Sequence, residues 1–340
     1  MAIAIDKVEL PRIAIIGCGA AAERFYIPHL IAHPQFASRV TLIDRSEARL
    51  GAMAEAYGFT SLSTDLDAAL DDLDAAIITT PHRSHAPLAI QCMSAGLNVL
   101  VEKPIACSRR DADEVAALAA ANGRTVMVNN TRRMFPSYRR VHEMIRQGEL
   151  GRIEQMSIFD GGPLEWQSVT GLALGPDGEK HGVLMDRGAH SVDILCWWLG
   201  GEPEIVSAQS DAWGGSDSVF ELHIESDGVP AALKLSRLFK LANRFEVRGT
   251  QATVSGDLFD WSNLELTPNG GKPQRVRAGE KGLMFEGFVG ELLVNFINAC
   301  NGSEAPRFTG ADVLPSIRVI EEAYDRASRF ELEWYSAVNA

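Results

Sequence analysis

The sequence predicts an α/β protein in two parts, a doubly wound parallel sheet followed by a region of mostly antiparallel strands. Short apolar segments alternate with amphipathic helical segments up to about Asn129, which is typical of a parallel sheet with helices on both faces. After Asn130, turn residues separate segments of alternating polarity such as VFELHIE and AALKLSRL, which indicates half-exposed antiparallel strands. These observations predict two domains, residues 1–130 and 131–340.

Composition excludes several classes of function. The chain has 340 residues, 46% hydrophobic and 23% charged, as expected of a globular protein with two domains. The chain has no run of about 18 apolar residues, so we expect no membrane span. The acidic start MAIAIDKVEL does not look like a secretion signal. The net charge of -13 disfavours a nucleic-acid partner. We therefore expect a cytoplasmic protein that binds a small molecule.

The cysteines are odd in number and scattered. None of the five has C-x-x-C spacing, so we expect reduced core thiols, with no disulfide and no metal site; they are Cys18, Cys92, Cys107, Cys196 and Cys300.

A glycine-rich turn follows the first apolar segment, Ile13–Ile16. Gly17 and Gly19, with Ala22, form a G-x-G-x-x-A pattern between a strand and a helix. In a dinucleotide-binding unit the first glycine permits the tight turn, the second admits a pyrophosphate, and the small third residue lets helix and strand pack closely. The helix N-terminus then offers free N–H groups to the phosphates. The same pattern also occurs in ordinary turns, so its context between a strand and a helix matters.

The second expected strand, residues 39–44, ends in Asp44. Its carboxylate can accept the ribose hydroxyls and repel a 2′-phosphate, which favours NAD over NADP. Arg45 is the complication, because its guanidinium can instead hold that phosphate. The structural alternative for Asp44 is an N-cap, with Ser46 as a rival cap for a helix over Glu47–Tyr57.

The rest of the first domain continues the alternation. We expect strands at Phe59–Leu62, Ala75–Thr79, Asn98–Val101 and Thr125–Asn129, and helices at Asp65–Asp71, from a Ser84 cap to Ala95, and from Ser108 to Asn122. The loop Thr80-Pro81-His82-Arg83-Ser84-His85 follows the carboxyl end of a buried strand, where open α/β sheets bind ligands.

In the second domain we expect several strands between 204 and 277. A glycine-rich loop at 161–182 lacks periodicity, and loops of this length are often functional. The other expected elements are a strand at Ile153–Phe159 and helices at Ser137–Gln147, Val183–Leu199, Val289–Cys300 and Ala311–Ser328.

Two groups of residues suggest catalysis. Lys103 ends a strand between Glu102 and Pro104, and its ammonium could hydrogen-bond a substrate oxygen beside a bound cofactor; the alternative is a solvated charge. On a helix, Asp186 and His190 are four apart and share a face, and Asp193 lies three beyond. A histidine held by a carboxylate suits a general base; the alternative is a partly buried histidine capped by its neighbours.

These parts together resemble the glucose-fructose oxidoreductase / inositol dehydrogenase / MocA family of NAD(P)-dependent oxidoreductases. The resemblance rests on Gly17-Cys18-Gly19, Asp44, TTPHRSHAPLAIQCMSAGLNVLVEKP at 79–104 and GVLMDRGAHSVDILCWWLG at 182–200. It implies an N-terminal Rossmann domain and a C-terminal α/β domain whose large, mostly antiparallel sheet commonly joins subunits. A homodimer or homotetramer is therefore expected.

The resemblance also implies roles for single residues. Lys103, Asp186 and His190 match the catalytic positions, and Arg133 and Trp166 join them as candidate substrate contacts. Two positions depart from the usual pattern: His82 stands where the family often has Asn, and Gln167 follows Trp166 where many members have a basic residue. The expected cofactor contacts are Gly17, Cys18, Gly19, Ala20, Ala21, Asp44, Arg45, Thr80, Pro81, His82, His85, Glu102 and Lys103.

The expected reaction is reversible oxidation of a secondary alcohol on a sugar, sugar derivative or cyclitol, with NAD as hydride acceptor. His190 takes the hydroxyl proton, Asp186 holds His190, and Lys103 stabilises charge on the substrate oxygen. Arg133 faces the substrate or is a surface arginine. Two alternatives stay open: a glycosidase or epimerase that uses NAD in a redox-neutral cycle, and a sugar or nucleotide sensor that does no chemistry.

Overall fold

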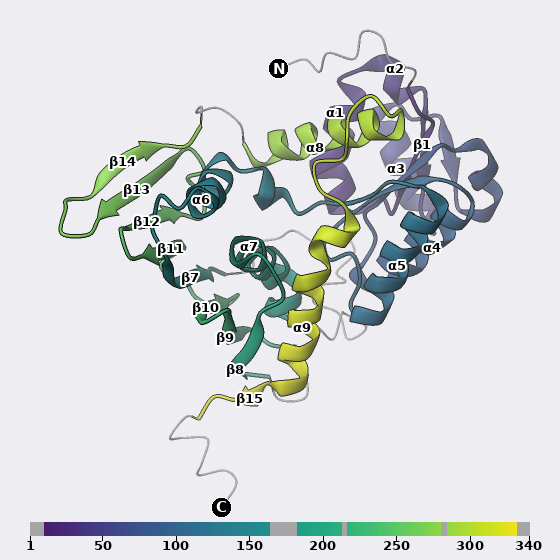
Figure 1. Cartoon of the computed structure of the whole chain (residues 1–340). Helices are drawn as coiled ribbons and strands as arrows, with labels where there is room; N and C mark the ends of the chain where they lie inside the picture. Colours follow the sequence, from purple (N-terminus) through teal and green to yellow (C-terminus); the bar gives the residue numbers. More distant parts are fainter. Residues whose placement is uncertain (1–9, 164–181, 213–215, 280–283, 332–340) are drawn as a thin grey trace, which may run out of the picture. The chain divides into compact units, whose positions relative to one another are not determined.

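A computed structural model describes residues 10–163, 182–212, 216–279 and 284–331 of the chain. These residues form two compact units, each built on its own sheet (Figure 1). The first unit holds the described residues up to Thr131, and the second begins at Arg132.

The single predicted boundary is incomplete, because the described residues 284–314 belong to the first unit. Their main element is helix α8, Phe285–Cys300. At its start Glu286 forms an ion pair of 3.0 Å with Arg24, and its carbonyl oxygen lies 2.8 Å from His29 Nε2. Such contacts between distant parts of the chain leave no local pattern in the sequence.

The first sheet has six parallel strands in the order β3-β2-β1-β4-β5-β6, with the direction of strand progression reversing between β1 and β4. All four residues of β1 and of β4 are buried, as expected for parallel strands covered on both faces. The prediction of a doubly wound sheet is confirmed. The strands are β1 Ile13–Ile16, β2 Val40–Ile43, β3 Ser61–Ser63, β4 Ala75–Ile78, β5 Asn98–Val101 and β6 Val126–Val128.

The helices of this unit begin mostly at the predicted caps. The Ser46 and Ser108 hydroxyls accept the N–H groups of Arg49 and Asp111. Ser84 does not act as the expected cap, because its backbone is already helical and its hydroxyl donates to Thr80 and Pro81 instead. The helices are α1 Ile27–Ile31, α2 Pro34–Ala37, α3 Glu47–Tyr57, α4 His85–Ser94, α5 Arg109–Asn122 and α8, with shorter turns η1 Ala22–Tyr26, η2 Asp67–Asp72, η3 His82–Ser84 and η6 Gly310–Val313. The turn η4, Thr131–Met134, begins at the last residue of this stretch and continues into the second unit.

The second sheet has nine strands in the order β14-β13-β12-β11-β7-β10-β9-β8-β15 (Figure 1). It is mostly antiparallel, as predicted; the parallel pairs are β7 with β10 and β8 with β15. The strands are β7 Ile153–Gly161, β8 Glu204–Ser210, β9 Val219–Ser226, β10 Val229–Ser236, β11 Arg244–Gly249, β12 Ala252–Asp257, β13 Asn263–Pro268, β14 Gln274–Arg277 and β15 Ser328–Arg329.

The helices of the second unit are α6 Pro136–Arg146, α7 Ala189–Leu199 and α9 Leu314–Arg326. An aromatic cluster of Tyr138, Trp198 and Phe245 joins α6, α7 and β11, with ring centroids 5.1–5.7 Å apart. The predicted helix over Val183–Leu199 is not uniform, because its first turn, η5 Leu184–Gly188, is π-helical. Across the described residues, no helix is long and apolar enough to cross a membrane.

Candidate active site

Four strand ends of the first sheet carry the predicted cofactor residues. Gly17–Gly19 follow β1, Asp44 follows β2, Thr80–Pro81 follow β4, and Glu102–Lys103 follow β5. Because the strands are parallel, these segments all lie at one edge of the sheet, and the order reverses there between β1 and β4. The sheet therefore brings these residues to the edge where such folds bind dinucleotides.

Glycine is needed at positions 17 and 19 of the turn for two different physical reasons. Gly17 has φ +92°, and a Cβ there would lie 2.7 Å from Thr80 Cγ2, so the turn packs too tightly for any side chain. A Cβ on Gly19 would have no described atom within 4 Å. Gly19 thus leaves open space in front of the helical stretch that begins at Ala20. This space fits a pyrophosphate group at a helix N-terminus.

The Asp44 carboxylate holds the glycine turn. Its Oδ2 accepts the Cys18 N–H at 2.8 Å and its Oδ1 accepts the Ser46 N–H at 2.9 Å. Ser46, not Asp44, caps helix α3. Arg45 is exposed beside this carboxylate.

The Cys18 side chain is a core thiol. Burial, followed by the nearby Asp44 carboxylate, raises the pKa of the Cys18 thiol to about 12. Arg49 donates to the Cys18 carbonyl and pairs with Glu23. Hydrogen bonds from Arg49 and Tyr57 lower the pKa of Glu23. Cys92 and Cys196 are likewise buried, as predicted for core thiols, whereas Cys107 and Cys300 are half-buried.

His85 ties two of the strand-end loops together. Its side chain is fully buried, with Nδ1 2.7 Å from the Pro104 carbonyl oxygen and Nε2 2.7 Å from the Thr80 carbonyl oxygen. Both ring nitrogens are therefore engaged by the protein. His85 therefore joins the loop after β4 to the Lys103–Pro104 turn.

Glu102 is fixed by two side chains that the sequence did not single out. Its Oε1 accepts hydrogen bonds from Tyr26 Oη at 2.8 Å and Asn129 Nδ2 at 2.7 Å, and its Oε2 accepts the Lys103 N–H at 3.2 Å. Burial, followed by the Glu102 charge, raises the pKa of Tyr26 well above its usual value, so its hydroxyl remains a donor. Asn129 follows β6 at this edge, and that position is a signal the sequence does contain.

In the second unit, the helical segment with Asp186 and His190 has a capped N-terminus. The carboxylate of Asp217 accepts the Leu184 N–H at 2.9 Å, and Tyr324 Oη accepts the Met185 N–H at 3.1 Å. Tyr324 also donates to Asp217 at 2.9 Å, and burial followed by that carboxylate raises the pKa of Tyr324. These caps hold the segment from Gly182 onward in place.

Asp186 and His190 are both half-buried. The residues that follow each of them are Arg187 and Ser191, and both contact Asp160. Residues four apart across this π-to-α junction therefore face the same way, which supports the predicted shared face of Asp186 and His190.

Asp193 forms an ion pair with a buried arginine. Its oxygens accept hydrogen bonds from Arg133 Nη2 at 2.7 Å and Nε at 2.8 Å, in a bidentate ion pair. Arg133 is 8% exposed, so its interpretation as a surface arginine is wrong. Its guanidinium also lies 5.5 Å from the ring centre of Trp197. Arg133 was predicted to contact the substrate, and its guanidinium already donates two hydrogen bonds to Asp193.

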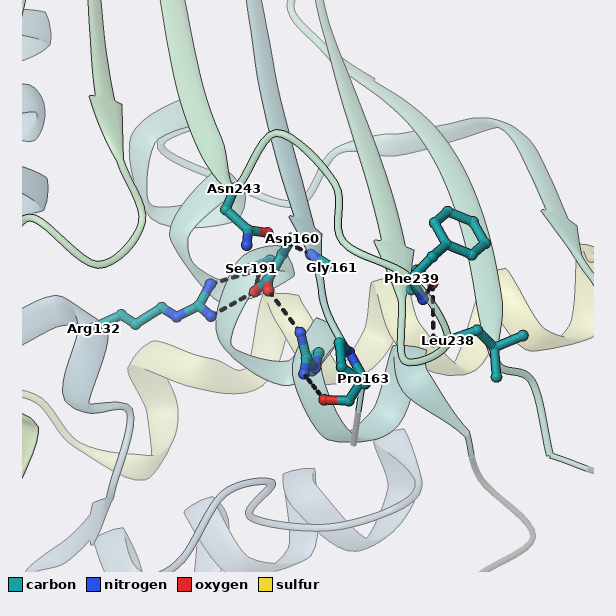
Figure 2. A network of polar contacts seen from close by, with 10 residues as sticks. Arg132, Asp160, Gly161, Pro163, Ser191, Leu238, Phe239 and Asn243 are labelled. Atoms are coloured by element: carbon teal, nitrogen blue, oxygen red, sulfur yellow. Dashed lines mark hydrogen bonds and ion pairs between the residues drawn. The ribbon is translucent and has the colours of Figure 1, made fainter. Parts of the chain in front are cut away.

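Figure 2 shows a charged cluster at the end of β7 that the sequence did not reveal. Arg132 donates to Asp160 at 2.5 Å and to Ser191 at 2.8 Å, and Arg187 Nη1 lies 3.4 Å from Asp160. Asp160 is buried on the same face of β7 as Met156 and Ile158, which alternate with it along the strand. An acid in the buried register of a strand is the signal that could have predicted a basic partner.

Two site predictions cannot be placed. Trp166 and most of the loop predicted at 161–182 lie outside the described residues. No group of three or more His, Cys, Asp or Glu residues with metal-binding geometry occurs in the part of the chain that the structure describes.

Comparison with known proteins decides the family. Residues 11–130 match a family described as "Oxidoreductase family, NAD-binding Rossmann fold", and residues 138–255 match the GFO/IDH/MocA C-terminal domain. The chain belongs to the Gfo/Idh/MocA family. This membership confirms the resemblance seen in the sequence, and the family description fits the Rossmann fold of the first unit.

Several named proteins are similar. A 4-carboxy-2-hydroxymuconate-6-semialdehyde dehydrogenase of Sphingobium sp. is 34% identical over 214 residues, 58% of this chain and 61% of that protein. An inositol 2-dehydrogenase of Rhizobium meliloti is 29% identical over 236 residues, 64% of this chain and 67% of that protein. The chain thus matches less than two thirds of the first of these Gfo/Idh/MocA relatives.

A solved structure shares the fold over nearly the whole chain. It is a 3-ketoreductase from Actinomadura kijaniata in complex with NADP and TDP-benzene, with a TM-score of 0.78 and 21% identity, covering 95% of this chain and all of that one.

Proposed function

We propose that this Gfo/Idh/MocA protein transfers a hydride between NAD(P) and a secondary alcohol or ketone of a sugar, sugar derivative or cyclitol. The observation that carries the proposal is the single sheet edge that holds the open glycine turn, Asp44 and Glu102–Lys103. The relative named as an inositol 2-dehydrogenase supports a substrate of this kind.

The residues of the first unit suit a dinucleotide. The open space at Gly19 accepts the pyrophosphate, and Asp44 accepts the adenosine ribose hydroxyls with the lone pairs that the Cys18 and Ser46 N–H groups do not use. Glu102, held by Tyr26 and Asn129, presents a fixed acceptor for hydroxyl groups beside Lys103. The nicotinamide, when bound, supplies the hydride acceptor or donor. We also propose that the loop after β4 contacts the dinucleotide through the predicted residues Thr80, Pro81, His82 and His85.

Proton handling falls to three side chains. His190 takes the hydroxyl proton during oxidation, and Asp186 orients its ring and stabilises the resulting cation. Lys103 donates a hydrogen bond to the substrate oxygen and so stabilises negative charge developing there. In reduction these proton movements reverse.

We propose NAD as the preferred dinucleotide, because the Asp44 carboxylate repels a 2′-phosphate. Arg45 keeps NADP possible, since it is exposed beside Asp44 and carries a charge that a phosphate can reach. Titration of both dinucleotides into wild type and Arg45→Gln tests this. If Arg45 serves NADP, the variant loses affinity for NADP and keeps its affinity for NAD.

The experiment for the catalytic roles compares His190→Ala with wild type. We expect a strong fall in kcat with little change in dinucleotide affinity, because His190 handles a proton and does not bind the cofactor. An unchanged kcat would remove His190 from the mechanism. Product without net NADH, from protein that keeps its dinucleotide through purification, would favour the redox-neutral alternative. Dinucleotide binding without turnover of any substrate would favour the sensor.

We also propose a cytoplasmic homodimer or homotetramer, joined through the face of the nine-stranded sheet. Val206 on β8 is 65% exposed there, an apolar side chain that a subunit contact would cover. Light scattering of wild type and Val206→Glu measures the mass and its dependence on this face.

A further inference from the structure

The charged cluster at the end of β7 has one more positive than negative charge. Arg132 faces the single carboxylate of Asp160 (Figure 2), and Arg187 Nη1 lies 3.4 Å from the same carboxylate. Asp160 is 1% exposed and its short contact, 2.5 Å, is to Arg132. Ser191 adds a further hydrogen bond to the same pair. Arg132 thus neutralises Asp160 without help from Arg187.

Arg187 is held only loosely by comparison. Its contacts with described residues are Nη1 to Asp160 at 3.4 Å and Nη2 to the Pro163 carbonyl at 3.5 Å, both at the long limit of hydrogen bonding. A guanidinium has five N–H donors in a planar fork that matches carboxylate and phosphate. Most of the donor capacity of Arg187 therefore remains available to a ligand.

Arg187 is also on the accessible side of the helical segment that carries Asp186 and His190. From Gly182 to Ser191, every residue is buried except Asp186, Arg187 and His190. The Arg187 side chain is 24% exposed. Gly162 lies beside the guanidinium: a Cβ there would be 3.8 and 3.9 Å from its two terminal nitrogens, so the glycine leaves that side uncovered.

We propose that Arg187 binds an oxyanion group of the substrate, a carboxylate or a phosphate, and that the substrates of this protein are therefore anionic. This inference rests on the proposed function, because it takes the segment with Asp186 and His190 as the substrate side of the site. A partly buried guanidinium with residual charge binds an anion more strongly than an exposed one, because water screens it less.

The net charge of the chain, -13, does not contradict this. At physiological ionic strength, charges farther than about 8 Å are largely screened. The excess positive charge beside Asp160 therefore dominates at the guanidinium, while the distant acidic groups mainly slow the arrival of an anion.

The test is a binding measurement that needs no turnover. Isothermal titration calorimetry compares D-gluconate with D-glucitol, and D-glucose 6-phosphate with D-glucose, on wild type, Arg187→Gln and Arg187→Lys. We expect wild type to prefer the anionic member of one pair. We expect Arg187→Gln to lose about 10- to 100-fold in affinity for it, the size of a lost charge-assisted hydrogen bond. The pair that shows the contrast identifies carboxylate or phosphate as the group.

Arg248→Gln is the matched control, since Arg248 is an exposed arginine on β11 opposite Gln155, toward the other end of β7 from Asp160. We expect it to bind as wild type does, and Arg187→Lys to keep part of the preference. Equal affinities within both pairs, no binding of either anion by wild type, or the same loss in Arg248→Gln would overturn the proposal. If anions bind but nicotinamide turnover is absent, the proposed reaction fails while the anion site stands.

Discussion

The ion pair between Arg133 and Asp193 predicts a stability effect that is separate from catalysis. In Asp193→Asn the shape of the side chain is kept, but the buried guanidinium loses its counter-charge. The side chains of Arg133 and Asp193 are 7% and 2% exposed, and two hydrogen bonds of 2.7 and 2.8 Å join them. Breaking a buried pair by removing one charge costs about 3–5 kcal/mol. The asparagine oxygen still accepts one hydrogen bond, so we expect a loss of about 3 kcal/mol.

Thermal unfolding followed by circular dichroism measures this loss. For a domain of about 150–250 residues, 1 kcal/mol corresponds to roughly 2–4 °C, so Tm should fall by about 6–12 °C. Asp186→Asn is the matched control, because Asp186 is half-buried in the same helical segment and is proposed to act on His190. We expect it to lower kcat and to leave Tm almost unchanged.

Two outcomes would refute this reasoning. A Tm of Asp193→Asn within about 2 °C of wild type would show that the pair is not an important stabilising contact. A fall in kcat at a temperature where Asp193→Asn is fully folded, as large as that of Asp186→Asn, would place Asp193 with the proton-handling residues after all. Replacing both Arg133 and Asp193 by apolar residues should restore much of the lost stability, because no charge is then left buried alone.

Three further predictions concern the first unit. Gly17→Ala should lower Tm and abolish dinucleotide binding, because the new Cβ would lie 2.7 Å from Thr80 and φ is +92°. Gly19→Ala should leave Tm unchanged but abolish dinucleotide binding, because its Cβ enters the open space proposed for the pyrophosphate. Equal effects of the two substitutions on Tm would contradict the geometry. Tyr26→Phe removes a donor to Glu102 and should weaken dinucleotide binding about 5- to 30-fold in a fluorescence titration, without loss of the fold. Cys18, with a thiol pKa raised to about 12, stays protonated at about pH 8 and should resist iodoacetamide until the protein unfolds; rapid labelling of the native protein, read by mass spectrometry, would argue against its burial.

The sequence predicted the features that depend on local patterns. Strands such as Ile13–Ile16, the positive-φ turn at Gly17 and the Ser46 and Ser108 caps follow from apolar runs and from residue types with defined conformational preferences. It could not predict which distant side chains meet. The contact of Arg132 with Asp160 and that of Tyr26 with Glu102 depend on how strands and helices pack, and the π-helical turn at Leu184–Gly188 depends on tertiary contacts.

The comparison with known families establishes the family, whereas the geometry of the first sheet concerns dinucleotide binding. The match of two family domains establishes the oxidoreductase family, and the sheet edge explains how Gly19, Asp44 and Glu102 suit a dinucleotide. We propose that substrate choice depends on the second unit, where the Arg187 guanidinium favours an anionic ligand.

The most direct test of the central claim is the absorbance of reduced nicotinamide in mixtures of the protein, NAD or NADP, and a panel of polyols, inositols, aldoses and sugar acids. We expect wild type to form NAD(P)H with at least one member of the panel. We expect Lys103→Ala to form none, although this variant should still bind dinucleotide. Equal NAD(P)H formation by Lys103→Ala, or failure of wild type to bind either dinucleotide, would contradict the central claim.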